Sequence, residues 1–244
     1  MDKELLAKAN AGDDSAMFKL GVACSEEGNH KGAVEWWDMS AEEGNRNAAI
    51  NLVFYHRNNA VGMANKQRFL YWLKKLAYYF KDGWGQVLLG IIYCGTRGHT
   101  VAFFGADSFV SELNPEEGLR LLNEGVPLAE EKGNPELTWV DYSDISASYS
   151  RYRINAYEGK EGFSKGKERQ NLEKELLYLR KSHEAHLGTT FAPERREFAQ
   201  KKNEYDLKRI DILEQELDGS IDIVTSHQKW VKATNEFHSA LGHN

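Results

Sequence analysis

One stretch decides the fold: GDDSAMFKLGVACSEEGNHKGAVEWWDMSAEEGN, residues 12–45. Its beginning, Gly12 with Ala16, returns 32 residues later as Gly44 with Ala48. Copies spaced by about 20 to 50 residues are typical of stacked repeats, because one such unit cannot bury its apolar face alone. The sequence therefore predicts consecutive helical units in this part of the chain.

Each expected unit begins with a helix that carries a large apolar residue, then a small one, then a ring one turn later. Leu20-Gly21 opens the series, and the pattern recurs as Leu89-Gly90 with Tyr93 and, more weakly, as Ile145-Ser146 with Tyr149. The small residue lets a neighbouring helix approach closely. Second helices are predicted at 33–43 and 69–77, where Trp72 lies 36 residues after Trp36. Their apolar residues share one face at three-to-four spacing.

The residues Ala16-x3-Leu20-Gly21, followed by Gly28 and by Ala33-x2-Trp36-Trp37-x3-Ala41-Glu-Glu-Gly44, resemble the Sel-1-like repeat (SLR) family, relatives of the tetratricopeptide repeat. The resemblance covers roughly residues 1–188, as about four degenerate repeats. It implies an all-α, right-handed α-α solenoid (superhelix) of antiparallel helix pairs. Members of this family typically act as protein-interaction scaffolds and not as enzymes.

One branch of the family carries a disulfide in nearly every repeat. Here Cys24 and Cys94 lie one per repeat, so no bridge within a repeat is possible. We expect two buried thiols that pack as small apolar residues.

The remaining residues, 189–244, are predicted to form a helical hairpin that caps the solenoid. Pro193 opens a charged helix that runs to Asp218, with Leu207 among its apolar stripe, and a second helix follows from Ile221. The stripe is too short for a sustained coiled coil. A dimerisation seam is the competing use, so the chain is expected to be a monomer or a weak homodimer.

The composition indicates a folded protein: 244 residues with 41% hydrophobic residues and a net charge of −6. Net acidity argues against a nucleic-acid partner, which needs a basic surface. No apolar run approaches the roughly 20 residues that cross a bilayer, and the first residues lack a signal-peptide pattern. We therefore expect a cytoplasmic protein that does not bind membranes. Acidic and basic segments alternate along the chain, which predicts mixed-sign faces suited to a protein partner.

Two long connections interrupt the repeat, at 95–114 and 155–171. Equivalent loops of stacked repeats lie along one edge, so both are expected on the same side. The first offers Phe103 and Phe104 as apolar anchors, and the second offers Lys165 and Lys167 as a charged rim. The alternatives are a plug over the core for the first loop and a solvated flexible segment for the second.

The expected helix at 139–156 combines Tyr and Arg, a composition typical of binding hot spots. Half of its rings follow core spacing, whereas Arg151 and Arg153 are predicted to be exposed. The predicted partner-binding set is therefore Phe103, Phe104, Tyr142, Arg151, Arg153, Lys165 and Lys167.

Signals for catalysis are weak. His183 and His186 lie at i and i+3, whereas the zincin pattern places its two histidines at i and i+4. We expect no cofactor and no metal. A metal-dependent or hydrolytic enzyme that uses these two histidines is kept as an alternative, as is a structural oligomer built on Trp230 and Phe237.

The sequence thus predicts a non-catalytic protein-interaction module that binds a partner through the solenoid groove and the inserted loops. The resemblance also implies a narrower hypothesis, because some bacterial SLR proteins act as immunity proteins that neutralise a cognate toxin. An acidic chain of this kind suits a basic toxin or effector. The residues themselves do not identify the partner.

Overall fold

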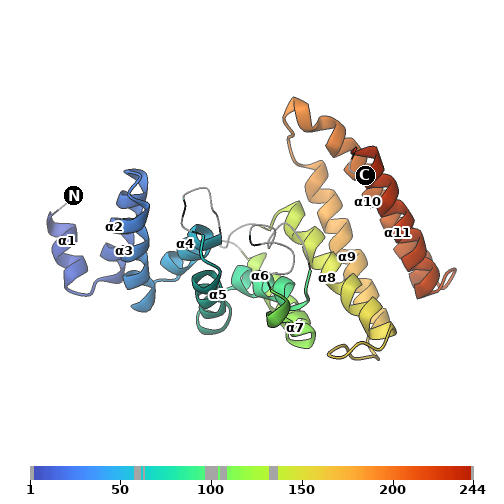
Figure 1. The fold of residues 1–244 in the computed structure, drawn as a ribbon, viewed down its shortest axis with the longest axis horizontal. Coiled ribbons are helices and arrows are strands. Elements are labelled where there is room, and N and C mark those ends of the chain that lie inside the picture. Colours follow the sequence, from blue (N-terminus) through green and yellow to red (C-terminus); the bar gives the residue numbers. More distant parts are fainter. Residues whose placement is uncertain are drawn as a thin grey trace. The chain divides into compact units, whose positions relative to one another are not determined.

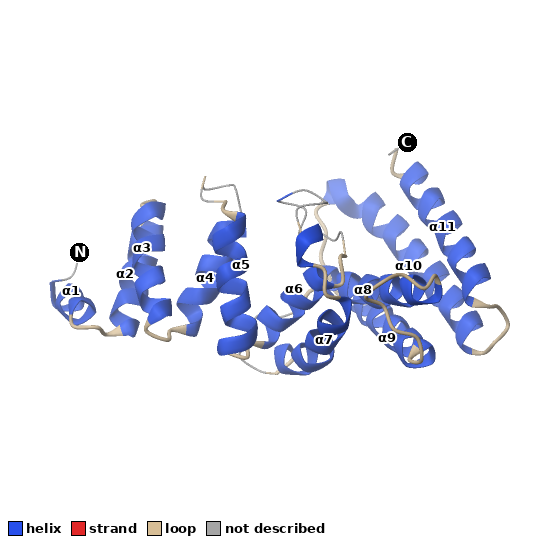
Figure 2. Ribbon diagram, turned by 60° about the horizontal axis from the view of Figure 1, so that its bottom comes forward, coloured by secondary structure: helices blue, strands red, loops and turns tan. Residues whose placement is uncertain are grey.

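A computed structural model describes residues 3–57, 62, 64–96, 104, 109–131 and 137–242. These residues form helices and loops and contain no strand (Figure 2). The predicted all-α class is confirmed. The α-helices of the described part are α1 Lys3–Asn10, α2 Asp14–Glu26, α3 His30–Glu42, α4 Arg46–Arg57, α5 Lys66–Lys74, α6 Gly83–Tyr93, α7 Pro115–Ala129, α8 Trp139–Tyr157, α9 Glu168–Leu187, α10 Arg196–Leu217 and α11 Ile223–Ala240. A π-helical turn, Lys75–Tyr79, follows α5, and short 3₁₀ helices lie at Val110–Glu112 and Pro193–Arg195.

The chain divides into two compact units. Unit 1 comprises residues 1–89, 101–108 and 123–134, and unit 2 comprises 90–100, 109–122 and 135–244. Within each unit, helices that follow one another in the sequence pack side by side (Figure 1), a pattern consistent with an α-helical solenoid. The boundary predicted after residue 188 lies inside unit 2, where α9 packs against α10.

In unit 1, residues at equivalent positions of the predicted repeat have the same backbone conformation and the same capping contacts. Gly12 and Gly44 end successive helix pairs with φ of +94° and +103°, a conformation that glycine adopts without a steric penalty. The side chain of Asp13 accepts from the Ala16 N–H at 2.8 Å, and that of Asn45 accepts from the Ala48 N–H at 3.1 Å. Each first helix is thus capped in the same way.

Successive helices of unit 1 are joined by polar contacts between matching ends. At the start of α2, Asp14 accepts a hydrogen bond from Nδ2 of Asn45 at 2.8 Å. Arg46, at the start of α4, pairs with Asp82, whose Oδ1 accepts from the Gly85 N–H of α6 at 2.6 Å. The same type of contact therefore recurs along the chain.

The second helices of unit 1 are linked as well. Asp38 of α3 accepts from the Trp72 indole of α5 at 3.0 Å and pairs with Arg68. Glu42, one turn later, pairs with Lys75 at 2.6 Å. The two predicted tryptophan-bearing helices are thus neighbours.

Glycines hold α6 and α7 together at two points. A Cβ at Gly90 would lie 2.9 Å from the Gly118 carbonyl oxygen, and one at Gly125 would lie 2.6 Å from Cβ of Gln86. No larger side chain fits such contacts without a shift of the backbone. Gly90, the small residue of the predicted Leu89-Gly90 pair, allows α6 and α7 to approach closely, as expected.

Unit 2 contains the helices that form the candidate site. The helix expected at 139–156 is present as α8, which begins at Trp139 behind a capping box of Thr138 and Asp141. Asn134 and Pro135, a pair typical of a helix start, lie outside the described residues. The predicted C-terminal hairpin is present as α10 and α11, which a bond of 3.1 Å between Tyr205 and Thr234 joins.

Both cysteines are buried and unbonded, as predicted. Cys94 is 1% exposed, and burial raises the pKa of its thiol to about 12. The thiolate that redox and metal chemistry require is therefore disfavoured at neutral pH.

Within the described ranges, no helix combines the length and the apolar character that crossing a bilayer requires.

Candidate binding pocket

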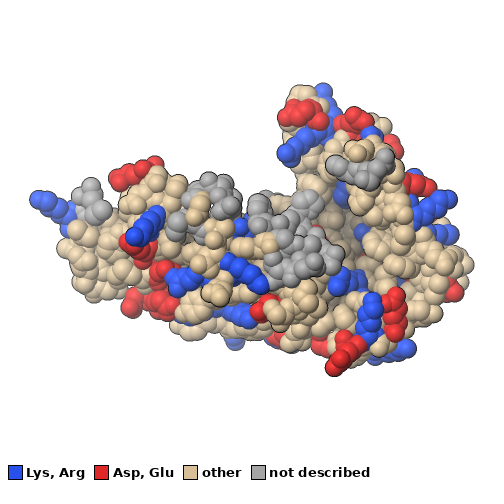
Figure 3. Space-filling view, viewed as in Figure 1, with Lys and Arg blue, Asp and Glu red and all other residues tan. Residues whose placement is uncertain are grey.

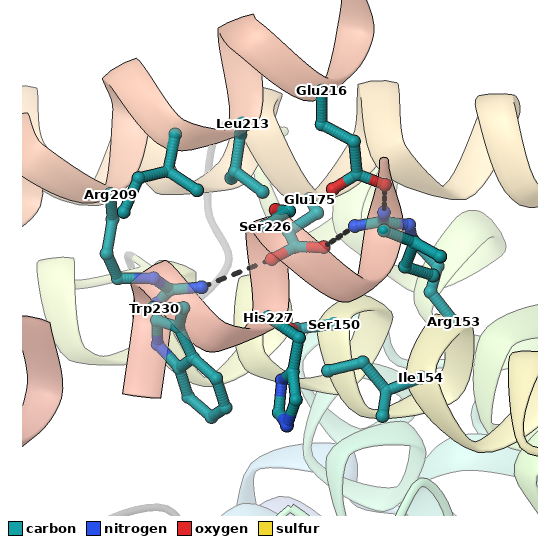
Figure 4. A pocket seen from close by; sticks show the side chains of 12 residues that line it. Ser150, Arg153, Ile154, Glu175, Arg209, Leu213, Glu216, Ser226, His227 and Trp230 are labelled. Carbon is teal, nitrogen blue, oxygen red and sulfur yellow. Dashed lines mark hydrogen bonds and ion pairs between the residues drawn. The ribbon is translucent and has the colours of Figure 1, made fainter. Parts of the chain in front are cut away.

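Four charged side chains form a buried row in unit 2. Arg153 of α8 pairs with Glu175 of α9 and with Glu216 of α10, and Glu175 also accepts from Nη2 of Arg209 at 3.2 Å (Figure 4). The side chains of Arg153 and Glu175 are 4% and 2% exposed. Burial opposes the charge of Arg153, but Glu175 and Glu216 raise the pKa of its guanidinium. The row thus ties three helices together and contains two charges of each sign.

The row positions the aromatic residues of α11. The guanidinium of Arg209 lies over the Trp230 ring, 5.6 Å from its centroid, and the Trp230 indole donates to the Tyr205 hydroxyl at 3.2 Å. The His227 ring lies 5.3 Å from that of Trp230. Figure 4 shows both rings on the same side of the row as Ile154.

On that side the surface is hollowed into a pocket of about 290 Å³. We call it the α8–α11 pocket, because α8 and α11 supply most of its wall. Arg209, His227 and Trp230 line one part. The opposite wall comes from Thr96 and from five positions of α8, which are Ala147, Ser150, Arg151, Ile154 and Asn155.

The pocket is rich in hydrogen-bond donors, and none of the described residues that line it carries a carboxylate. Arg151 is exposed and makes no ion pair with the described residues. Nη2 is the one nitrogen of the buried Arg209 that donates within the described part of the chain. Lys160 donates to Oδ1 of Asn155 at 2.9 Å, which leaves the amide NH₂ of Asn155 available. Nδ1 of the lining residue His227 is buried without a hydrogen-bond partner in the described part of the chain, and a ring nitrogen can donate or accept. The other unused groups named here are donors.

One predicted partner contact was wrong. Arg153 was expected to be exposed, but it is 3% exposed and belongs to the buried row. Arg151, two residues earlier, is exposed as predicted and lines the pocket. The apolar stripe predicted for the charged helix after Pro193, which is α10, was partly wrong too. Leu207 is 51% exposed, whereas Arg209 is buried.

The other predicted contacts lie elsewhere. Tyr142 is half-buried and stacks on Tyr178 at 6.5 Å, in the part of α8 that precedes the pocket. Phe103 lies outside the described residues, and Phe104 packs against Phe69 in unit 1 at 5.2 Å, as the plug alternative requires. Lys165 and Lys167 are exposed. Of the described ones, Phe104, Tyr142, Lys165 and Lys167 do not line the pocket.

The second insertion is shorter than predicted, since α8 extends to Tyr157 and α9 begins at Glu168. It is held to the residues that follow the first insertion. Glu116 accepts from the Ser164 N–H at 3.2 Å and from the Tyr152 hydroxyl. Burial acts against ionisation, but these hydrogen bonds lower the pKa of Glu116 below its ordinary value.

The two histidines of the enzyme alternative, His183 and His186, lie on α9. His186 is 2% exposed and lies between the rings of Trp139 and Phe191, at 5.1 and 4.8 Å. Neither of its ring nitrogens has a hydrogen-bond partner in the described structure. No group of three or more His, Cys, Asp or Glu side chains able to hold a metal occurs among the described residues.

Trp230 and Phe237, on which the oligomer alternative rests, make contacts within the α10–α11 hairpin. Trp230 contacts Arg209 and Tyr205, and Phe237 stacks on Tyr205 at 4.8 Å. A polar substitution of either ring would therefore disturb the hairpin itself.

Glu175, Arg209, His227 and Trp230 were not predicted as site residues. The buried face of α10 contained a signal, because Lys202, Asp206, Arg209 and Leu213 follow one another at spacings of four, three and four. Charged residues at core spacing indicate buried ion pairs.

Compared with protein-family models, with curated proteins and with solved structures, the chain matches none.

Proposed function

We propose that this chain is a non-catalytic protein-interaction module, an SLR-type right-handed solenoid whose partner seats in the α8–α11 pocket. The observation that carries the proposal is Arg151, which is exposed, has no ion-pair partner among the described residues, and lines a pocket whose wall includes Trp230. Arg and Trp are the residues most enriched at binding hot spots, which cluster in pockets of this kind.

The surroundings of the pocket favour a protein as the partner. Val224 and Val231 of α11 are 39% and 40% exposed, and they flank the turn that carries His227 and Trp230. Seven residues apart, they lie on one face of the helix. A partner that fills the pocket can cover this apolar strip as well. On the face shown in Figure 3, acidic and basic side chains are interspersed, the mixed pattern that favours a protein over a polyanion.

Affinity capture followed by mass spectrometry tests the proposal. Ala147→Leu fills the pocket without a change of charge, and Arg151→Gln removes the free cation. Arg196→Gln is the matched control, because Arg196 is exposed in the same unit and does not line the pocket. We expect one partner to be recovered with the wild type and with Arg196→Gln, and lost with both pocket variants. Equal recovery with all four proteins would refute the site.

The narrower hypothesis of an immunity protein concerns the same partner. A toxin gene beside this one would support it, and purified toxin that remains active at excess wild-type chain would refute it.

A further inference from the structure

We propose that the α8–α11 pocket recognises a single carboxylate on a short apolar stem. The inference rests on the proposed function only for the origin of that carboxylate, which is an acidic side chain of the partner. The other source of the same chemistry is a free organic acid.

The charge of the pocket fits one negative group. The row of Glu216, Arg153, Glu175 and Arg209 is neutral as a whole, because it contains two carboxylates and two guanidiniums. Lys160, beside Asn155, pairs with Glu158 at 2.7 Å. Among the described residues that line the pocket, the one charge without an ion-pair partner is that of Arg151, so a monoanion balances it and a dianion does not.

The donors of the pocket fit a planar acceptor. A guanidinium presents its N–H groups in a fork that matches a carboxylate. Arg151 supplies such a fork, Arg209 lines the same pocket and uses one nitrogen, Nη2, toward Glu175 within the described residues, and the Asn155 amide adds a neutral donor. Glu175 fixes the orientation of Arg209 from the opposite side, so the buried guanidinium is already oriented before a ligand enters.

The rest of the lining sets the size and polarity of the ligand. Ala147, Ile154 and Trp230 offer carbon surface to a stem that carries the carboxylate. The volume of about 290 Å³ lies just below the range of small-molecule sites, about 300–1,000 Å³. One acidic side chain or a short organic acid fits this space, whereas a dinucleotide cofactor does not.

Nuclear magnetic resonance titrations test the inference with two pairs of probes. N-acetylglutamate N-methylamide is compared with the neutral glutamine analogue, and butyrate with butyramide. The side-chain amide signals of Asn155 report on the pocket. We expect saturable shifts with at least one acid, and at least about ten-fold weaker binding of its amide, since a charge-assisted hydrogen bond is lost.

Two variants and one control locate the effect. Arg151→Gln and Ala147→Leu are each expected to weaken acid binding about ten-fold or more, while Arg196→Gln binds as the wild type. Saturation by the capped glutamate assigns the carboxylate to a partner side chain, and saturation by butyrate alone assigns it to a free acid. Equal binding of acids and amides, unchanged binding in both pocket variants, or no saturable shift with either acid would overturn the inference.

The titrations and the capture experiment fail independently. If the acids do not bind but Ala147→Leu still loses the partner, this inference is wrong and the proposed function stands. If the acids bind but capture is the same for every variant, the carboxylate site stands and the proposed function is wrong.

Discussion

The indole of Trp37 in α3 lies directly against the backbone of Gly21 in α2. A Cβ at Gly21 would lie 2.4 Å from both Cδ1 and Nε1 of the ring, and Nε1 donates to the Phe18 carbonyl at 3.3 Å. The two helices of the first pair therefore meet at a point where only glycine fits, because the rigid ring cannot move aside.

Gly21→Ala is expected to destabilise the protein. Alanine favours a helix by about 1 kcal/mol over glycine, but overpacking against a ring costs about 1–3 kcal/mol or more. We expect a net loss of about 1–2 kcal/mol in urea unfolding. Gly188→Ala is the control, since its Cβ would meet no atom closer than 3.6 Å. Equal stability of the two variants would show that α2 and α3 do not touch at Gly21.

Arg153→Leu is expected to cost about 3–5 kcal/mol of stability, because it leaves Glu175 and Glu216 buried without their shared cation. Arg151→Leu, two residues earlier on the same helix, is the matched control, and we expect a change within about 0.5 kcal/mol. Urea unfolding of both variants measures the difference. Similar losses in both would contradict the buried row.

His186→Phe is expected to stabilise the protein by about 1 kcal/mol near neutral pH, because it removes two buried nitrogens without partners. Burial and the neighbouring Lys202 lower the pKa of His186 below 6.5, whereas Asp206 acts in the opposite direction. The unfolded chain therefore takes up this proton first, so stability is complete above the ordinary histidine pKa and declines as the pH falls through it.

Thermal unfolding at about pH 7.5 and about pH 5.5 measures this decline. We expect the wild type to lose more stability between the two than His186→Phe does. The exposed His238→Gln should decline as the wild type. A decline in His186→Phe as steep as in the wild type would assign the effect to other groups.

Glu116→Gln is expected to loosen the second insertion. Glu116 accepts from Ser164 and Tyr152, and its pKa is lowered, so its stabilisation is present above about pH 4.5 and is lost as the pH falls through the folded value. Hydrogen exchange at the Ser164 amide should be faster in the variant, and its stability should fall less on acidification. Unchanged exchange would show that Glu116 does not hold the insertion.

Local patterns predicted much of the fold. Leu20-Gly21 and the tryptophan-bearing helix predicted the first helix pair, and Pro193 with its apolar stripe predicted the hairpin. These features are encoded within a few helical turns. The start of α8 was predicted as well, since the helix expected at 139–156 begins at Trp139, where Thr138 and Asp141 form a capping box.

The site was predicted only in part, because its ion pairs join distant residues. Arg151 and Arg153 are two positions apart on α8, which places them roughly 200° apart around the axis. One must therefore face inward when the other faces outward. The buried partners of Arg153 lie 22 and 63 residues away in the chain, and no local pattern identifies them.

Hydrogen exchange of the captured complex tests the central claim most directly. If the partner seats in the α8–α11 pocket, amides of α11 and of the second half of α8 will gain protection on binding, and those of α2 and α3 will not. Protection confined to α2 and α3, with α11 unchanged, would contradict the proposed site.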